Sequence, residues 1–261
     1  IVTTLHFKMM SSAQADQQQQ DPCSVATLNN GAAHEMLRGN HVMAVRMLSS
    51  ALKQTSSYLR FSKAQPNVNE GVEDEGRIEN QSFCSFLPHR EVGIGDEDQE
   101  ECFLFASPLQ IDHFRTNNSG RPTPSPRILA EAFSYAIVYN LALCHHLAAM
   151  TMLEASKRMS HLRRAVALYD QARRLVVKGL KPMHRIVVCN NLGHANRTLG
   201  SEEASRKCFR QVLMIITSET AAVSSVGQEE PSSAPVQLDG FLRNALHWVS
   251  GSCTTVAAAA Q

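Results

Sequence analysis

Hydrophobic residues recur at intervals of three and four between residues 21 and 63. Such spacing places them on one face of an α-helix. Asp21-Pro22 precedes the first apolar position, as a helix N-cap followed by proline at the first helical position would. Gly39-Asn40 interrupts the pattern, so a helical hairpin is predicted here. The apolar positions that carry the pattern are Val25, Leu28, Ala32, Met36, Val45, Leu48, Ala51 and Leu52.

The same spacing returns over residues 127–216, again after a Ser-Pro pair at 125–126. Turn signals near 150–154, near 179–182 and at Gly200 predict two further helical hairpins. A Ser/Pro/Glu-rich linker is expected at 217–236. Residues 237–250 form a shorter amphipathic segment, which we interpret as a helix capping the last hairpin, with a flexible tail at 251–261.

Residues 64–126 interrupt the helical pattern and are predicted to be an insert or linker. Two short apolar segments within it, Phe83–Leu87 and Cys102–Leu109, are expected to pair as a small β-hairpin. Between Glu70 and Glu101 the insert has eleven acidic residues and two arginines, a net charge of −9. The polar N-terminal residues 1–20, which end in four glutamines, are expected to be disordered.

The three predicted hairpins share one residue template. In each second helix a small residue is followed by a large one four positions later and a small or β-branched one three further on. In each first helix an asparagine precedes a close-packing pair, and Gly39 and Gly200 mark equivalent turns. Small residues let two antiparallel helices approach closely. The first-helix triplets are Asn30-Gly31-Ala32, Asn140-Leu141-Ala142 and Asn191-Leu192-Gly193; the second-helix triplets are Ala44-Leu48-Ala51, Ala165-Tyr169-Ala172 and Ser205-Phe209-Val212.

This template resembles the tetratricopeptide repeat (TPR). The resemblance implies an all-α fold of antiparallel helical hairpins in a short superhelical array. The second copy departs from the pattern, since 23 positions separate Ala142 from Ala165 against 12 in the other copies, which predicts two longer helices. The positions expected to pack the repeats are Ala32, Gly39, Ala44, Leu48, Ala51, Leu141, Ala142, Ala165, Tyr169, Ala172, Leu192, Gly193, Gly200, Ser205, Phe209 and Val212.

In TPR proteins the first helices line a concave groove that commonly holds an extended peptide or a partner helix. A carboxylate clamp is not expected, because Asn29 and Asn191 stand where lysine and arginine would be needed. An asparagine amide both donates and accepts, so it can bind a ligand's backbone; alternatively, the recurring asparagines cap or bridge neighbouring helices. The resemblance places these residues on the groove: Asn29, Asn30, Met36, Tyr139, Asn140, His146, Asn190, Asn191, His194 and Arg197.

Charge is nearly balanced over the 261 residues, at +1, but residues 157–210 carry thirteen cations and three acids, a net charge of +10. Three interpretations stay open. The cations form solvated helix faces, or the acidic insert folds over them and occupies the groove, or an acidic protein or RNA binds there. No aromatic residues alternate with the cations to stack on bases, which makes nucleic acid an unlikely partner.

The remaining chemistry favours an interaction protein over an enzyme. Seven scattered cysteines predict a reducing, intracellular environment. Because the sequence starts at Ile1 and not at methionine, an incomplete N-terminus is one interpretation. The longest apolar stretch contains Asn140, His145 and His146, so a core helix is expected instead of a membrane span. No catalytic, metal or cofactor site is expected. The leading hypothesis is a non-catalytic scaffold that binds a protein or peptide; a nucleic-acid-associated repeat protein is the alternative, and an enzyme the third.

Overall fold

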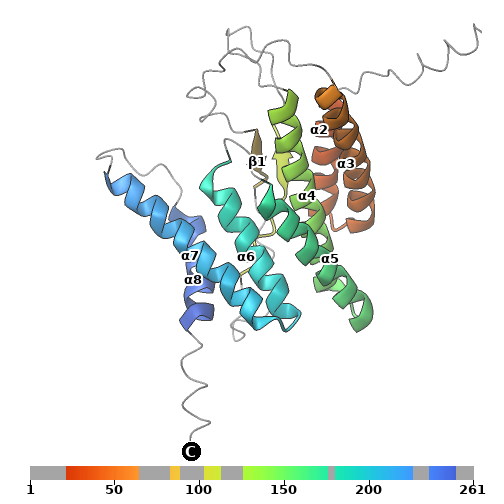
Figure 1. Cartoon of the computed structure of the whole chain (residues 1–261). Coiled ribbons are helices and arrows are strands. Elements are labelled where there is room, and N and C mark those ends of the chain that lie inside the picture. Colours follow the sequence, from red (N-terminus) through yellow and green to blue (C-terminus); the bar gives the residue numbers. More distant parts are fainter. Residues whose placement is uncertain are drawn as a thin grey trace, which may run out of the picture.

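The computed structural model describes residues 22–64, 83–88, 103–112, 126–175, 180–225 and 235–250. These residues are mostly helical, with one small sheet (Figure 1). The helices are α2 (Pro22–Leu37), α3 (His41–Ala64), α4 (Pro126–Thr151), α5 (Ala155–Arg174), α6 (Pro182–Thr198), α7 (Glu202–Ser225) and α8 (Pro235–Ser250); the strands are β1 (Cys84–Phe86) and β2 (Leu109–Ile111).

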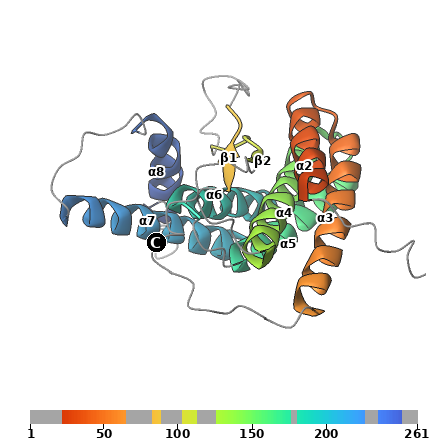
Figure 2. The same cartoon turned by 90° about the horizontal axis from the view of Figure 1, so that it is seen from above.

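Consecutive helices pack as antiparallel pairs, and each pair packs against the next. The pairs are α2–α3, α4–α5 and α6–α7, followed by α8 against α7. The first hairpin stacks directly on the second through contacts of α3 and α2 with α4, although the insert separates them in sequence. Figure 2 shows α2, α4, α6 and α8 forming an arc around the two strands. The prediction of a largely helical architecture of sequential antiparallel hairpins is therefore confirmed, with a small two-stranded sheet beside it.

Two glycines end the first helices of the outer hairpins. Gly39 and Gly200 have φ angles of +78° and +76°, a left-handed conformation that glycine adopts without a Cβ clash. The Gly39 amide donates to Met36 O at 2.9 Å, and the Gly200 amide donates to Arg197 O at 2.7 Å. These hydrogen bonds satisfy carbonyls at the helix ends and reverse the chain within a few residues.

Several of the predicted repeat-packing positions are buried within the helical hairpins, whereas Gly39 and Gly200 are exposed at the turns. Ala32, Ala44, Ala142 and Ala165 are fully buried, as are the large residues of the second helices. Between Ala142 and Ala165 the second hairpin is longer on both sides of its turn, as predicted, because α4 runs on to Thr151 and α5 starts at Ala155. The buried large residues are Leu48, Tyr169 and Phe209.

The third hairpin has the closest helix approach at Gly193. A Cβ atom added there would lie 2.9 to 3.1 Å from ring atoms of Phe209. Ser205 on α7 donates from its hydroxyl to Gly193 O at 2.9 Å. Glycine at this position therefore makes room for an aromatic ring that is itself fully buried.

Replacing Gly193 with alanine is expected to lower the free energy of unfolding by about 2 kcal/mol, because overpacking outweighs the gain in helix propensity. Urea unfolding followed by circular dichroism measures the change. The matched control is Phe209→Leu, which removes the ring edge. In the Phe209→Leu background, Gly193→Ala should cost nothing, and an equal cost in both backgrounds would exclude the ring contact as the cause.

Two predicted boundaries differ from the structure. Residues 217–225 belong to α7 and are helical, where a linker was predicted, and α8 begins at Pro235 within that same predicted linker. The helical spacing continues through Thr217 and Ser218, whose hydroxyls bond back to carbonyls of the preceding turn and so remain compatible with a helix. The predicted N-terminal segment 1–20 and tail 251–261 lie outside the described residues.

The small sheet consists of two antiparallel strands. Cys84 pairs with Ile111, Ser85 with Gln110 and Phe86 with Leu109. The expected hairpin partner, Cys102–Leu109, was placed too early. Its described residues 103–108 are extended without regular strand pairing, and β2 starts only at Leu109.

α4 is the one helix within the described ranges that is long and apolar enough to cross a membrane by length and composition. Most of that stretch is buried against neighbouring helices, which is the expected environment of a core helix in this array.

Candidate functional site

Residues 103–112 run in an extended conformation along the inner face of the array. Their path crosses the four helices of the arc, from α8 at Phe103 to α2 at Ile111 (Figure 2). Phe105, Ser107, Leu109 and Ile111 are each at most 3% exposed. The concave surface that the sequence predicted as a ligand groove therefore contains a segment of the same chain.

Asparagine side chains on α2 and α4 hold one end of this segment. The Ile111 amide donates to Asn30 Oδ1 at 2.8 Å, and Asn30 Nδ2 donates to Ile111 O at 2.9 Å. The Leu109 amide donates to Asn140 Oδ1 at 2.8 Å, and Asn140 Nδ2 donates to Leu109 O at 2.7 Å. Each amide group thus pairs with both backbone groups of one residue, as a neighbouring strand would.

The same arrangement recurs on α6 and α8 at the other end. The Phe105 amide donates to Asn191 Oδ1 at 3.1 Å, and Asn191 Nδ2 donates to Phe105 O at 2.9 Å. For Phe103 the corresponding distances to Asn244 are 2.8 and 2.6 Å. We call Asn30, Asn140, Asn191 and Asn244 the asparagine ladder; they come from α2, α4, α6 and α8.

Two further asparagines join the members of the asparagine ladder in two pairs. Asn29 lies between Asn30 and Asn140: its Nδ2 donates to Asn30 Oδ1 at 3.2 Å, and its Oδ1 accepts from Asn140 Nδ2 at 2.9 Å. Asn190 connects Asn191 to Asn244 in the same way, at 3.2 and 2.7 Å. Some of the asparagines therefore bind backbone of the same chain and others bridge helices, and binding of a separate ligand stays a prediction.

Alternate residues of the segment use opposite edges. The odd-numbered residues face the asparagine ladder, whereas even-numbered residues bond to the β1 side. There the Leu87 amide donates to Pro108 O at 3.0 Å, and the Asp112 amide donates to Phe83 O at 3.1 Å. At the centre, the Tyr139 hydroxyl donates to Ser107 O at 3.0 Å. The segment is a strand with one edge hydrogen-bonded to a row of asparagine side chains, in place of a neighbouring strand.

Apolar contacts fix the side chains of the odd-numbered residues. The Phe103 ring lies edge-on to Phe241 at 5.2 Å between centroids, over Gly240, where an added Cβ would come within 2.9 Å of it. The Phe105 ring lies 5.6 Å from Phe241 and 4.9 Å from Phe86. Leu109 and Ile111 are fully buried.

Six of the ten residues placed on the groove by the sequence contact this segment: Asn29, Asn30, Tyr139, Asn140, Asn190 and Asn191. The other four have different surroundings. His146 Nε2 and His194 Nδ1 lie 3.0 Å apart and bond to each other, Arg197 lies over the Trp248 ring, and Met36 is buried in the core.

Sequence reasoning missed the contribution of α8. Interpreted only as a capping helix, it supplies Asn244, Gly240 and Phe241, which hold the Phe103 end of the segment. The signal was present in Asn244-Ala245, where an asparagine again precedes a small buried residue. It was too short to recognise without the second helix that completes the template in the other hairpins.

The titratable groups near the groove are held neutral. Burial lowers the pKa of His194 to about 4 and that of His146 well below its usual value. Burial likewise raises the pKa of the Cys84 and Cys144 thiols to about 12, so neither is a thiolate near neutral pH. Across the described ranges, no three His, Cys, Asp or Glu side chains converge as metal ligands.

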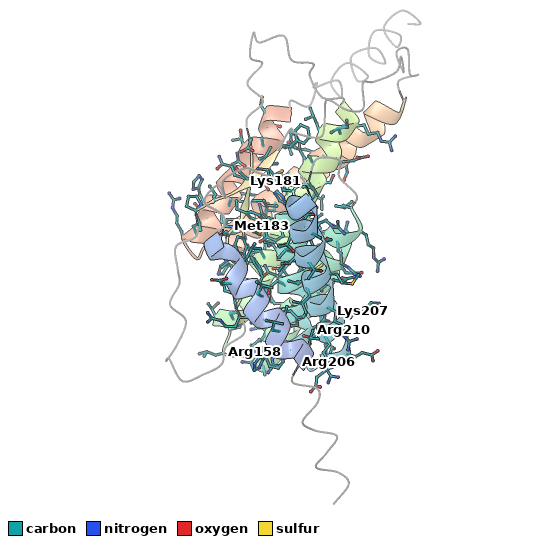
Figure 3. The ribbon with its side chains drawn as sticks, turned by 90° about the vertical axis from the view of Figure 1, so that its left-hand side faces the viewer. Arg158, Lys181, Met183, Arg206, Lys207 and Arg210 are labelled. Atoms are coloured by element: carbon teal, nitrogen blue, oxygen red, sulfur yellow. The ribbon has the colours of Figure 1, made fainter. Side chains whose placement is uncertain are left out.

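Basic side chains on α7, the second helix of the third hairpin, are exposed or partly exposed. Arg206, Lys207 and Arg210 on α7 lie toward the same end of the array as Arg158 on α5 (Figure 3). Arg206 forms an ion pair with Glu202 at 2.7 Å. The part of the insert that occupies the groove is apolar, and the acidic residues of 70–101 lie outside the described residues.

Comparison of the chain with family models, with curated proteins and with solved structures gives no match. The fold and the site define an array of antiparallel helical hairpins with an extended segment of the same chain in its groove.

Proposed function

We propose that this chain is a non-catalytic, TPR-like interaction scaffold whose groove binds an extended polypeptide. The observation that carries the proposal is the asparagine ladder, in which four amide side chains bind both backbone groups of residues 103, 105, 109 and 111. A buried extended segment needs hydrogen-bond partners for its backbone amides and carbonyls, and here asparagine side chains supply them. A row of amides at strand spacing adds a surface that recognises polypeptide backbone.

The recurrence of the asparagines in every hairpin supports the TPR-like assignment. Each member of the asparagine ladder lies one or two residues before a small residue at the helix crossing, so one repeat template positions both the packing and the binding groups. Repeat proteins commonly use the concave surface of stacked helices for recognition. The buried, protonated thiols and neutral histidines supply no activated nucleophile, which agrees with a binding role.

The nature of the bound segment indicates the ligand class. It is an extended strand held mainly through its backbone, and residues 103–111 carry no charged side chain. A helix would present no free backbone amides to these asparagines, because its own hydrogen bonds use them. We therefore favour an extended peptide over a partner helix.

Selection of displayed random peptides on the full-length chain tests the proposal. The Phe103→Ala chain is screened in parallel, because it loosens the resident segment. In the loosened Phe103→Ala chain, selected peptides are expected to lose at least tenfold in affinity when Asn30→Ala or Asn244→Ala is added, because each removes one end of the asparagine ladder.

The matched control is Asn196→Ala on α6, since Asn196 bonds only within its own helix, to Leu192 O at 3.0 Å. Binding to this variant should be unchanged. Failure to select any peptide on either folded chain, or binders that are indifferent to Asn30 and Asn244, would contradict a backbone-binding groove.

A further inference from the structure

We infer that residues 103–111 act as a resident competitor, and that the external partner of the groove is an extended segment with the same side-chain pattern. That pattern has two aromatic residues two positions apart, followed four positions later by two aliphatic residues two positions apart. The inference rests on the proposed function and adds to it the identity of the recognised sequence class and the means by which access to the groove is limited.

The asparagine ladder fixes the register of the bound strand, that is, which of its residues lie opposite each asparagine. Each of its members needs a free amide hydrogen and a free carbonyl from the residue it binds. Residues at the positions of 103, 105, 109 and 111 therefore cannot be proline. Pro108, the one proline in the segment, stands at an even position, where its carbonyl still accepts from the Leu87 amide.

The groove also restricts the side-chain pattern. The two aromatic positions meet an aromatic surface made by Phe241 and Phe86, and the space above Gly240 admits the flat ring of Phe103. The two aliphatic positions are fully enclosed at Leu109 and Ile111. By contrast, Leu104, Ala106 and Gln110 are only partly buried, so these even positions have less influence on which sequence fits than Pro108, which is buried.

The two ends of the resident segment are held by different numbers of hydrogen bonds, which determines the end from which the segment is displaced. The Ile111 end has bonds on both edges, to the asparagine ladder and to β1. The Phe103 end lies beyond the β1 pairing, and Phe103 itself is only partly buried. Among the described residues this end has the fewer bonds, those of Phe103 to Asn190 and Asn244, so an incoming strand starts to replace the segment here, at α6 and α8.

The resident segment competes strongly with an external peptide because it is covalently part of the same chain. A segment of the same chain has an effective concentration in the millimolar range when its tether can span the site, so an external peptide of equal intrinsic affinity binds weakly. Any change that loosens the resident segment raises the apparent affinity for the partner by the same factor. The groove is consequently selective for partners that bind better than the resident sequence, or for conditions that release it.

The test uses a fluorescent peptide with the sequence of residues 101–113, carrying Cys102→Ser to avoid oxidation. Anisotropy measures its binding to the natural full chain and to the Phe103→Ala chain, both checked for helicity by circular dichroism. The peptide is expected to bind the natural chain weakly and the Phe103→Ala chain at least tenfold more tightly. If Phe103→Ala does not fold, Gly240→Val, which clashes with the Phe103 ring of the resident segment, provides a second loosened chain and is probed with a peptide carrying alanine at the position of Phe103.

Backbone methylation of the peptide supplies the matched pair of probes. An N-methyl group at the position of Leu109 removes the amide hydrogen that Asn140 accepts, and should abolish binding. An N-methyl group at the position of Ala106 should leave binding nearly unchanged. Equal affinity of the unmodified peptide for the natural and loosened chains would overturn the competitor, and insensitivity to methylation at Leu109 would overturn the register.

The outcomes separate this inference from the proposed function. If the peptide fails on a folded, loosened chain while displayed peptides of another pattern bind and depend on Asn30, the pattern is wrong and the scaffold stands. If neither binds, both fail.

Discussion

Replacing Asn140 with alanine is expected to lower the free energy of unfolding by about 4 kcal/mol, one of the two largest effects predicted for this chain. Asn140 is fully buried, and so is Leu109, whose amide and carbonyl it binds. Alanine leaves the Leu109 amide without its partner in a site closed to water, whereas the Leu109 carbonyl keeps the hydrogen bond from Asn29 Nδ2 at 3.0 Å. Asn29 also loses the hydrogen bond that its Oδ1 accepts from Asn140.

Urea unfolding of the full chain, monitored by circular dichroism at 222 nm, measures this change. Asn196→Ala is the control, because it removes a buried asparagine of the neighbouring groove helix that binds only Leu192 O. Its cost should be about 1 kcal/mol. Equal costs for the two variants would mean that binding of the segment contributes little to the stability of the array.

Acidification is expected to remove about 4 kcal/mol of stability between pH 7.5 and pH 5, through His146 and His194. Their rings bond to each other inside the array, with Tyr169 beside His146 and Arg197 near His194. Burial holds the pKa of His194 near 4 and that of His146 well below its usual value of 6.5. Below about pH 6.5 these two histidines therefore bind protons in the unfolded chain but stay neutral in the folded chain.

The sign follows from the lowered pKa values. The contribution of the pair is complete above pH 6.5 and is lost as the pH falls from 6.5 toward 4. Burial also lowers the pKa of His145, which faces His161 and Arg164, so this residue acts in the same direction. Urea midpoints at pH 7.5, 6 and 5 measure the loss. In the His146→Gln/His194→Gln chain the pH dependence should shrink, even where its stability at pH 7.5 is lower; an unchanged pH dependence would assign the acid sensitivity to other groups.

The helices and their pairing could be predicted from sequence because they depend on local signals. Apolar spacing, the glycines at 39 and 200 and the prolines at 22 and 126 mark the starts and ends of the helices. Small residues at matching positions in both helices of a hairpin predicted which faces pack. These signals span at most a few turns of helix, and the hairpins are built from contacts of that range.

The site could be predicted only in part. The recurring asparagines at 30, 140 and 191 indicated a backbone-binding surface, and the structure shows backbone bound there. What they bind depends on contacts between distant residues, such as Asn244 with Phe103, which lie 141 positions apart. An apolar segment in an acidic insert has the same local pattern whether it forms one strand of a hairpin or crosses four helices, so its path required the three-dimensional structure.

The spacing between successive residues bound by the asparagine ladder restricts the sequences that fit the groove. From Phe103 to Ile111 the ladder advances two, four and two residues, and eight residues of strand span about 26 Å. Shared among three steps between four helices, this is about 9 Å per step, close to the usual distance between packed helices. The four-residue step falls where Tyr139 takes the place of an asparagine, and strand periodicity allows such slack only in even increments. The groove thus accepts only even spacings between the residues that the asparagines bind. A sequence one residue longer between its aromatic and aliphatic positions would present the wrong backbone edge to half of the asparagines.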